Sequence, residues 1–174
     1  HNYVQTEEDY FSVIMGKTAL LISAACEIGG LAAGAGERQQ TALRVYGLGI
    51  GSAFQVVDDI LDYQGDVKKT GKVPGNDLAE GKMTLPLILA MQRADKDDND
   101  LLQEIVRDET ARVDKVYDVI DLINKYQGFA DSTRKAEEMV TEALEAIEIF
   151  DKPEQQESVE LLRSLARYIL TREK

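Results

Sequence analysis

The sequence has one cysteine, fewer basic residues than acidic ones, and no long uninterrupted apolar run. The lone cysteine, Cys26, excludes an internal disulfide framework and fits a reducing compartment, so we expect a cytoplasmic protein in which Cys26 is a packing residue. The net charge of −12, from 20 lysines and arginines against 32 aspartates and glutamates, argues against nucleic acid as a partner. No apolar run reaches the ~18 residues of a membrane span and the first residues carry no signal-peptide pattern, so we expect no transmembrane segment.

Patterns typical of strands and of repeat proteins are also missing. No run alternates apolar and polar residues with a period of two, and no similarity recurs at a spacing of about 20–50 residues. An apolar content of 44% and a charged content of 30% are typical of a soluble globular protein, and 174 residues suit a single helical domain over 1–174. Apolar residues at helical spacing predict an all-α fold, with helices near residues 6–33, 37–63, 84–94, 97–107, 111–126, 131–150 and 153–171.

Two capping signals help to place these helices. Thr6 is followed by three acidic residues, as at a helix N-terminus. The acidic run Asp95–Asp100 lacks the glycine that a calcium-binding loop needs at its sixth position. We therefore interpret that run as an interhelical turn with a helix cap.

Glycine is unevenly distributed. Gly47, Gly49 and Gly51 lie inside the expected 37–63 helix, where each costs about 1 kcal/mol relative to alanine. Close helix packing would explain them, and close approach of a ligand is the alternative. Residues 64–82 combine glycines and a proline without periodicity, which predicts a long loop of the kind that is usually functional or disordered.

The segment Phe54–Asp62 is the strongest candidate for chemistry. On a helix, Gln55, Asp58, Asp59 and Asp62 fall within an arc of about 100°, while the valines, isoleucine and leucine of the segment occupy the opposite side. Neighbouring carboxylates repel one another unless a cation lies among them, and Mg²⁺ takes oxygen ligands such as carboxylates and substrate phosphates. The sequence therefore predicts part of a metal–diphosphate site.

Lysines that could bind phosphate lie close to this segment. Four follow it, at Lys68, Lys69, Lys72 and Lys82. Gly81-Lys82 does not form a nucleotide phosphate loop, because Met83 stands where serine or threonine is required and no strand precedes it. Lys17 lies in the middle of an expected helix among apolar residues, where a charge is costly unless it is paired or faces a cavity. We interpret Lys17 as a phosphate ligand, with extension of its side chain to the surface as the alternative.

Four short motifs occur in the order and at the separations found in a known family. Within residues 1–93 they are Gly16-Lys17-Thr18-Ala19, Phe54-Gln55-x-x-Asp58-Asp59-x-x-Asp62, Thr70-Gly71-Lys72 and Asp77-Leu78-x-Glu80-Gly81-Lys82-x-Thr84-Leu85-Pro86. Together they resemble the trans-type isoprenyl diphosphate synthases, the polyprenyl synthetase family, and most closely its bacterial medium- and long-chain members. The resemblance implies an antiparallel helical bundle of the isoprenoid synthase type around a central cavity.

The resemblance also implies a reaction and a role for each matching residue. The reaction is the Mg²⁺-dependent head-to-tail condensation of isopentenyl diphosphate with an allylic diphosphate, through an allylic cation, in isoprenoid biosynthesis. The metal ligands would be Asp58, Asp59 and Asp62. The departing diphosphate would be bound by Lys17, Lys72 and Lys82. Thr18 and Gln55 would line the reacting carbons and, with Lys17 and Lys72, form the catalytic set.

One part of the family pattern does not occur in this sequence. Family members carry a first aspartate-rich motif upstream of the Lys-Thr pair, but only sixteen residues precede Lys17 and none of them matches it. We therefore expect the C-terminal portion of a synthase, inactive by itself, whose partners are the N-terminal part of the same protein and a second copy in a homodimer. The alternatives are a non-catalytic or regulatory subunit of a prenyl synthase and a class I terpene cyclase.

Overall fold

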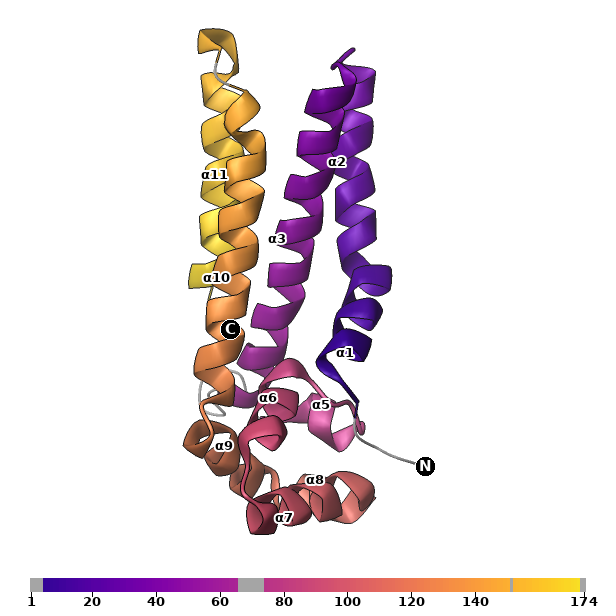
Figure 1. Cartoon of the computed structure of the whole chain (residues 1–174), viewed down its shortest axis with the longest axis vertical. Coiled ribbons are helices and arrows are strands. Elements are labelled where there is room, and N and C mark those ends of the chain that lie inside the picture. The colour runs from indigo at the N-terminus through magenta and orange to yellow at the C-terminus, as the bar shows by residue number, and fades with distance from the viewer. Residues whose placement is uncertain (1–4, 66–73, 151, 173–174) are drawn as a thin grey trace. The chain divides into compact units, whose positions relative to one another are not determined.

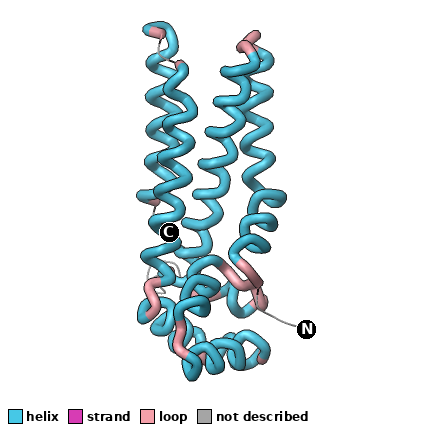
Figure 2. The backbone as a smooth tube through the Cα atoms, in the orientation of Figure 1, coloured by secondary structure: helices cyan, strands magenta, loops and turns pink. Residues whose placement is uncertain are grey.

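The structure is a computed structural model that describes residues 5–65, 74–150 and 152–172. Every regular element within these ranges is a helix, as Figures 1 and 2 show, so the predicted all-α class is confirmed. The elements are α1 (Glu7–Ile14), the π-helix η1 (Met15–Ala19), α2 (Leu20–Ala32), α3 (Glu37–Gln64), α5 (Asn76–Ala79), α6 (Leu85–Arg93), α7 (Lys96–Arg107), α8 (Glu109–Asp114), α9 (Val116–Lys125), α10 (Gly128–Ala146), the 3₁₀ turns η2 (Ile147–Ile149) and η3 (Pro153–Gln155), and α11 (Gln156–Thr171).

Contacts within the chain define two compact units. The short-helix unit comprises residues up to Tyr10 together with Asp58–Thr133, and the long-helix unit comprises Phe11–Val57 together with Arg134–Arg172. Helix α3 supplies residues to both units, with the change between Val57 and Asp58. That the whole chain is a single domain stays a prediction.

The first long helix starts and stops where the sequence predicts. Thr6 and Asp9 form a reciprocal cap, in which the Asp9 amide donates to Thr6 Oγ1 at 3.1 Å and the Thr6 amide donates to Asp9 Oδ2 at 3.0 Å. At the other end Gly34 adopts a left-handed backbone conformation with φ of 73°, which a glycine tolerates without strain. Helix α3 then begins at Glu37.

Glycines in α3 allow the helices of the long-helix unit to approach closely. A Cβ at Gly47 would lie 2.7 Å from the Cα of Ser23 in α2, and one at Gly49 would lie 2.8 Å from the carbonyl oxygen of Met139 in α10. Figure 1 shows α2 beside α3 and α10 beside α11. The predicted packing role of these α3 glycines is therefore confirmed, because a side chain at either position would meet the backbone of a neighbouring helix.

A buried tyrosine ties α11 to α3 in the same unit. Tyr46 in α3 is fully buried, and its hydroxyl donates to the carbonyl oxygen of Leu162 in α11 at 2.8 Å. Burial raises the pKa of Tyr46 to about 12, so the hydroxyl keeps its proton and acts as a donor. Helices that are more than a hundred residues apart in sequence are joined by this bond.

The outer face of α2 leaves several large apolar side chains exposed. Leu20, Leu21, Ile28 and Leu31 are each more than half exposed. By length and composition alone the continuous helix Glu7–Ala32 could cross a membrane. The sequence predicts no such span, because Lys17 and Glu27 interrupt the apolar runs of this helix. Core helices of soluble proteins meet the same criterion, so this is weak evidence for a membrane span.

Helix α6 forms the centre of the short-helix unit. Its residues Leu85–Met91 are all buried, and Thr84 precedes them in an extended conformation with Pro86 in the first turn of the helix.

Asp95 caps α7 by accepting a hydrogen bond from the Asp98 amide, as predicted.

One predicted helix is wrong. The segment expected as a single helix over 111–126 is two helices, α8 and α9, joined at Lys115. Arg112 Nη1 donates to the carbonyl oxygen of Val106 at the end of α7, which holds α8 there, while Val116 begins α9 as a buried residue. The apolar spacing continues across Lys115, so the sequence pattern does not reveal the break.

Candidate functional site

The C-terminal part of α3 presents an acidic face, as the sequence predicts. Asp58, Asp59 and Asp62 are partly exposed, whereas Val56 and Ile60 are buried. The apolar side of the helix thus anchors it in the protein, and the three carboxylates share the opposite side.

Two of these carboxylates are held by groups distant in sequence. The hydroxyl of Tyr10 donates to Asp59 Oδ2 at 2.6 Å, and the backbone amide of Asp77 donates to Asp62 Oδ2 at 2.9 Å. The Gly75 amide also donates to the Asp62 carbonyl oxygen at 2.9 Å. The residues at the end of α3 and those at the start of α5 are therefore fixed to one another.

Tyr10 is a site residue that sequence reasoning missed. It is only 3% exposed, and burial together with the negative charge of Asp59 raises the pKa of its hydroxyl well above the ordinary value. The hydroxyl therefore stays protonated and donates to the carboxylate. Sequence offers no signal for this pair because 49 residues separate the partners and Tyr10 alone fits an ordinary helix.

The predicted phosphate ligand Lys82 is paired with acids of its own chain. Its Nζ lies 2.9 Å from Asp77 Oδ1 and 2.7 Å from Glu80 Oε2, and these two carboxylates raise the pKa of Lys82. Gly81 before it has φ of 80°, and the amides of Gly81 and Lys82 donate to the carbonyls of Leu78 and Asp77. This is the Schellman arrangement that terminates a helix, so Gly81 has a backbone role at the end of α5.

Three predicted site residues lie in the long-helix unit. Lys17 and Thr18 belong to the π-helix η1, a rare element that often marks a functional site. Lys17 is exposed, so its charge carries no burial cost. The Thr18 hydroxyl donates to Oε1 of the buried Gln55 at 3.0 Å, so these two side chains are in contact. The remaining predicted residue, Lys72, falls outside the described residues.

The described residues contain no group of three or more histidine, cysteine or acidic side chains arranged to hold a metal ion by themselves. The donor chemistry at the end of α3 nevertheless fits Mg²⁺, which commonly takes one or two protein carboxylates and completes its shell with water and substrate phosphates. Asp58 and Asp59 could thus form one side of a metal site, with Asp62 close by on the same face.

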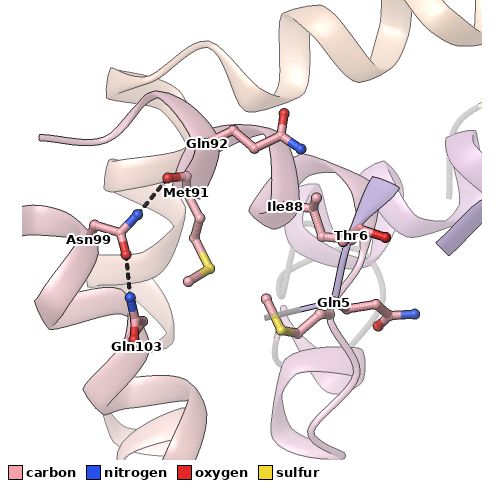
Figure 3. A pocket seen from close by; sticks show the side chains of 8 residues that line it. Gln5, Thr6, Ile88, Met91, Gln92, Asn99 and Gln103 are labelled. Atoms are coloured by element: carbon pink, nitrogen blue, oxygen red, sulfur yellow. Dashed lines mark hydrogen bonds between the residues drawn. The ribbon is translucent and has the colours of Figure 1, made fainter. Parts of the chain in front are cut away.

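A cavity among the described residues is lined by none of the predicted site residues. It lies in the short-helix unit, has a volume of about 380 Å³, and is shown in Figure 3. Its lining includes Met83, which precedes α6, and Ile88 and Met91 of α6, together with several side-chain amides. One of these amides, Asn99 Nδ2, donates to the Met91 carbonyl oxygen at 2.6 Å. The acidic face is therefore a separate feature.

Comparison with known proteins matches these observations to a family. The family described as polyprenyl synthetase matches residues 1–123. The chain belongs to the polyprenyl synthetase family. Within this polyprenyl synthetase chain the matched range includes the Lys-Thr pair, the acidic face of α3 and α5.

Relatives of this polyprenyl synthetase chain make prenyl diphosphates of different lengths. It is 34% identical over 154 residues to the octaprenyl diphosphate synthase of Haemophilus influenzae, covering 88% of this chain and 46% of the relative. It is 36% identical over 168 residues to a short chain isoprenyl diphosphate synthase of Methanothermobacter thermautotrophicus, covering 97% of this chain and 50% of the relative. Among solved structures, geranylgeranyl pyrophosphate synthetase of Pyrococcus horikoshii aligns with a TM-score of 0.87 at 33% identity, covering 99% of this chain and 51% of that one.

These alignments confirm the resemblance and the isoprenoid synthase fold. They also show that the polyprenyl synthetase chain spans about half the length of the relatives it matches.

Proposed function

We propose that this chain is the part of a prenyl diphosphate synthase that carries its second aspartate-rich motif, and that the whole enzyme condenses isopentenyl diphosphate with an allylic diphosphate. The observation that carries the proposal is the acidic face of Asp58, Asp59 and Asp62 on a helix whose opposite, apolar side is buried, in a chain of the polyprenyl synthetase family. The names of its relatives, which are prenyl diphosphate synthases, support the same reaction class.

The proposed reaction depends on departure of a diphosphate from an allylic carbon. Mg²⁺, when bound, would supply positive charge to that leaving group. Asp58 and Asp59 are the proposed protein ligands, with Asp62 supporting them through its hydrogen bond to the Asp77 amide. Lys17 and Lys72 are the proposed cationic ligands of the diphosphate.

Lys82 is proposed as a conditional phosphate ligand. Because Asp77 and Glu80 already pair with its ammonium group, a diphosphate would have to compete with those two carboxylates. Its contribution to binding should therefore be smaller than that of a lysine without such partners.

Thr18 and Gln55 are proposed to face the cationic carbon. The Thr18 proton is directed to Gln55 Oε1, so the lone pairs of the Thr18 oxygen are left for other partners. An oxygen with available lone pairs stabilises a nearby positive charge, and it does so more strongly in a site from which water is excluded.

The exposed apolar face of α2 is proposed to be an interface with another part of the family domain. Leu20, Leu21, Ile28 and Leu31 form an apolar surface of the kind that marks an interface. We expect it to be covered by the half of the family domain that this chain does not span. Homodimerisation and a cytoplasmic location also remain expectations.

The test is a prenyl transfer assay on the protein that contains this chain and the rest of the family domain. Labelled isopentenyl diphosphate and an allylic diphosphate should give a linear, longer prenyl diphosphate only when Mg²⁺ is present. Residues 1–174 alone should give no product. A cyclic hydrocarbon would favour a terpene cyclase, and activity that requires a separate catalytic subunit would favour a regulatory role. Robust condensation by residues 1–174 alone would contradict the division proposed here.

A further inference from the structure

The hydrogen bond between Tyr10 and Asp59 joins the start of the chain to the acidic face of α3. At 2.6 Å it is short, as expected when a hydroxyl donates to an ionised carboxylate. The tyrosine ring is buried and its hydroxyl reaches the carboxylate at the protein surface.

Tyr10 is itself fixed by the helix start. Its backbone amide donates to the Thr6 carbonyl oxygen at 3.0 Å, and the reciprocal cap between Thr6 and Asp9 determines where α1 begins. A buried ring on a capped helix has few alternative positions. The Tyr10 hydroxyl that donates to Asp59 is therefore held in place.

We propose that Tyr10 is a positioning residue for the metal-binding motif, which acts by holding the Asp59 carboxylate in one orientation beside Asp58. The inference rests on the proposed function, since it concerns the same motif. Without the hydroxyl, Asp59 loses the hydrogen bond from Tyr10 that orients its carboxylate, and its charge is less compensated next to that of Asp58. Partners that orient metal ligands in this way typically contribute 10–100-fold to metal affinity.

The experiment uses Tyr10→Phe in the protein that contains the whole family domain. This change removes one oxygen and leaves the buried ring. Mn²⁺, which shares the oxygen preference of Mg²⁺, is titrated in the presence of inorganic pyrophosphate, and free Mn²⁺ is followed by electron paramagnetic resonance. We expect an affinity about tenfold weaker than wild type. In the prenyl transfer assay the Mg²⁺ concentration at half-maximal rate should rise similarly, while turnover at saturating Mg²⁺ stays within about twofold, because a positioning residue acts on assembly of the site.

The matched control is Tyr46→Phe, which also removes a buried hydroxyl that donates a hydrogen bond, but to a backbone carbonyl. It should lower thermal stability without changing Mn²⁺ affinity. A second test is the double variant with Asp59→Asn. If Tyr10 acts through Asp59, then Tyr10→Phe should have little further effect on Mn²⁺ affinity in that background.

The outcomes separate this inference from the function on which it rests. Wild-type protein that neither binds Mn²⁺ with pyrophosphate nor transfers prenyl groups would overturn both. Wild-type protein that does both, combined with a Tyr10→Phe variant of unchanged Mn²⁺ affinity and Mg²⁺ dependence, would overturn only the positioning role. Additive effects of Tyr10→Phe and Asp59→Asn would also overturn it.

Discussion

Replacement of Gly47 by alanine should destabilise the chain, although alanine is the better helix former. A Cβ at this position would lie 2.7 Å from the Cα of Ser23 and 2.9 Å from the carbonyl oxygen of Ile22. Both are backbone atoms of α2, so neither can move aside by changing a rotamer. Gly29 on α2 is the matched control, since a Cβ there meets nothing within 4 Å.

The magnitude follows from two opposing terms. Alanine in a helix is favoured over glycine by about 1 kcal/mol. Overpacking a well-packed contact costs about 1–3 kcal/mol. The cost at Gly47 should be near the upper end of that range, because the new Cβ would clash with backbone atoms of α2 rather than with a movable side chain. Gly47→Ala should therefore lower the free energy of unfolding by about 2 kcal/mol, whereas Gly29→Ala should raise it by about 1 kcal/mol.

The assay is urea denaturation of residues 1–174 followed by circular dichroism at about 222 nm, because the chain has no tryptophan for fluorescence and is helical throughout its regular elements. The midpoint of Gly47→Ala should fall and that of Gly29→Ala should rise. If both variants shifted the midpoint upward by the same amount, the close packing of α2 on α3 would be wrong.

Two further predictions concern side-chain hydrogen bonds. Tyr46→Phe should lower the free energy of unfolding by about 1 kcal/mol, since it removes the buried bond to the Leu162 carbonyl oxygen, and equal urea midpoints would argue against that contact. Hydrogen bonds from Lys125, and then from Tyr126, lower the pKa of Asp98 below its ordinary value. Stabilisation from the lowered pKa is present above the unfolded-state pKa of about 3.9 and is lost as pH falls through the lower folded-state value. Asp98→Asn should therefore reduce the thermal midpoint at pH 7 and flatten its decline on acidification, and an unchanged acid decline would contradict this.

Much of the helical architecture could be predicted because local signals coincide with helix ends. Thr6 caps the first helix and Asp95 caps α7, as their side chains and positions suggest. The glycines inside α3 could be assigned to packing because their cost in a helix requires a compensating close approach. Such signals lie within a few residues of the feature they predict.

Features that depend on distant contacts could not be predicted in this way. The sequence predicts a loop over residues 64–82, yet Asn76–Ala79 forms the short helix α5. The start of α5 is bound by Asp62 and its end is set by the left-handed Gly81. Four residues are too few to show helical periodicity. The break at Lys115 was missed for the opposite reason, because helical periodicity continues across it.

The candidate site was predicted in its composition but not in its contacts. Helical spacing alone separates Asp58, Asp59 and Asp62 from the buried side of α3. Spacing cannot show that Tyr10 binds Asp59 or that Lys82 is paired with two acids, because these contacts arise only when separate segments fold together.

If the acidic face of α3 serves a metal-dependent prenyl transfer, the Asp58→Asn variant should lose most of that activity. Turnover is measured in the protein that contains the whole family domain, over a range of Mg²⁺ concentrations, with Asp121→Asn as the control because Asp121 is an exposed aspartate on α9. Asp58→Asn should reduce turnover about 100-fold, equivalent to roughly 2.7 kcal/mol of transition-state stabilisation, while Asp121→Asn should leave it unchanged. Wild-type turnover and Mg²⁺ dependence in Asp58→Asn would contradict the account.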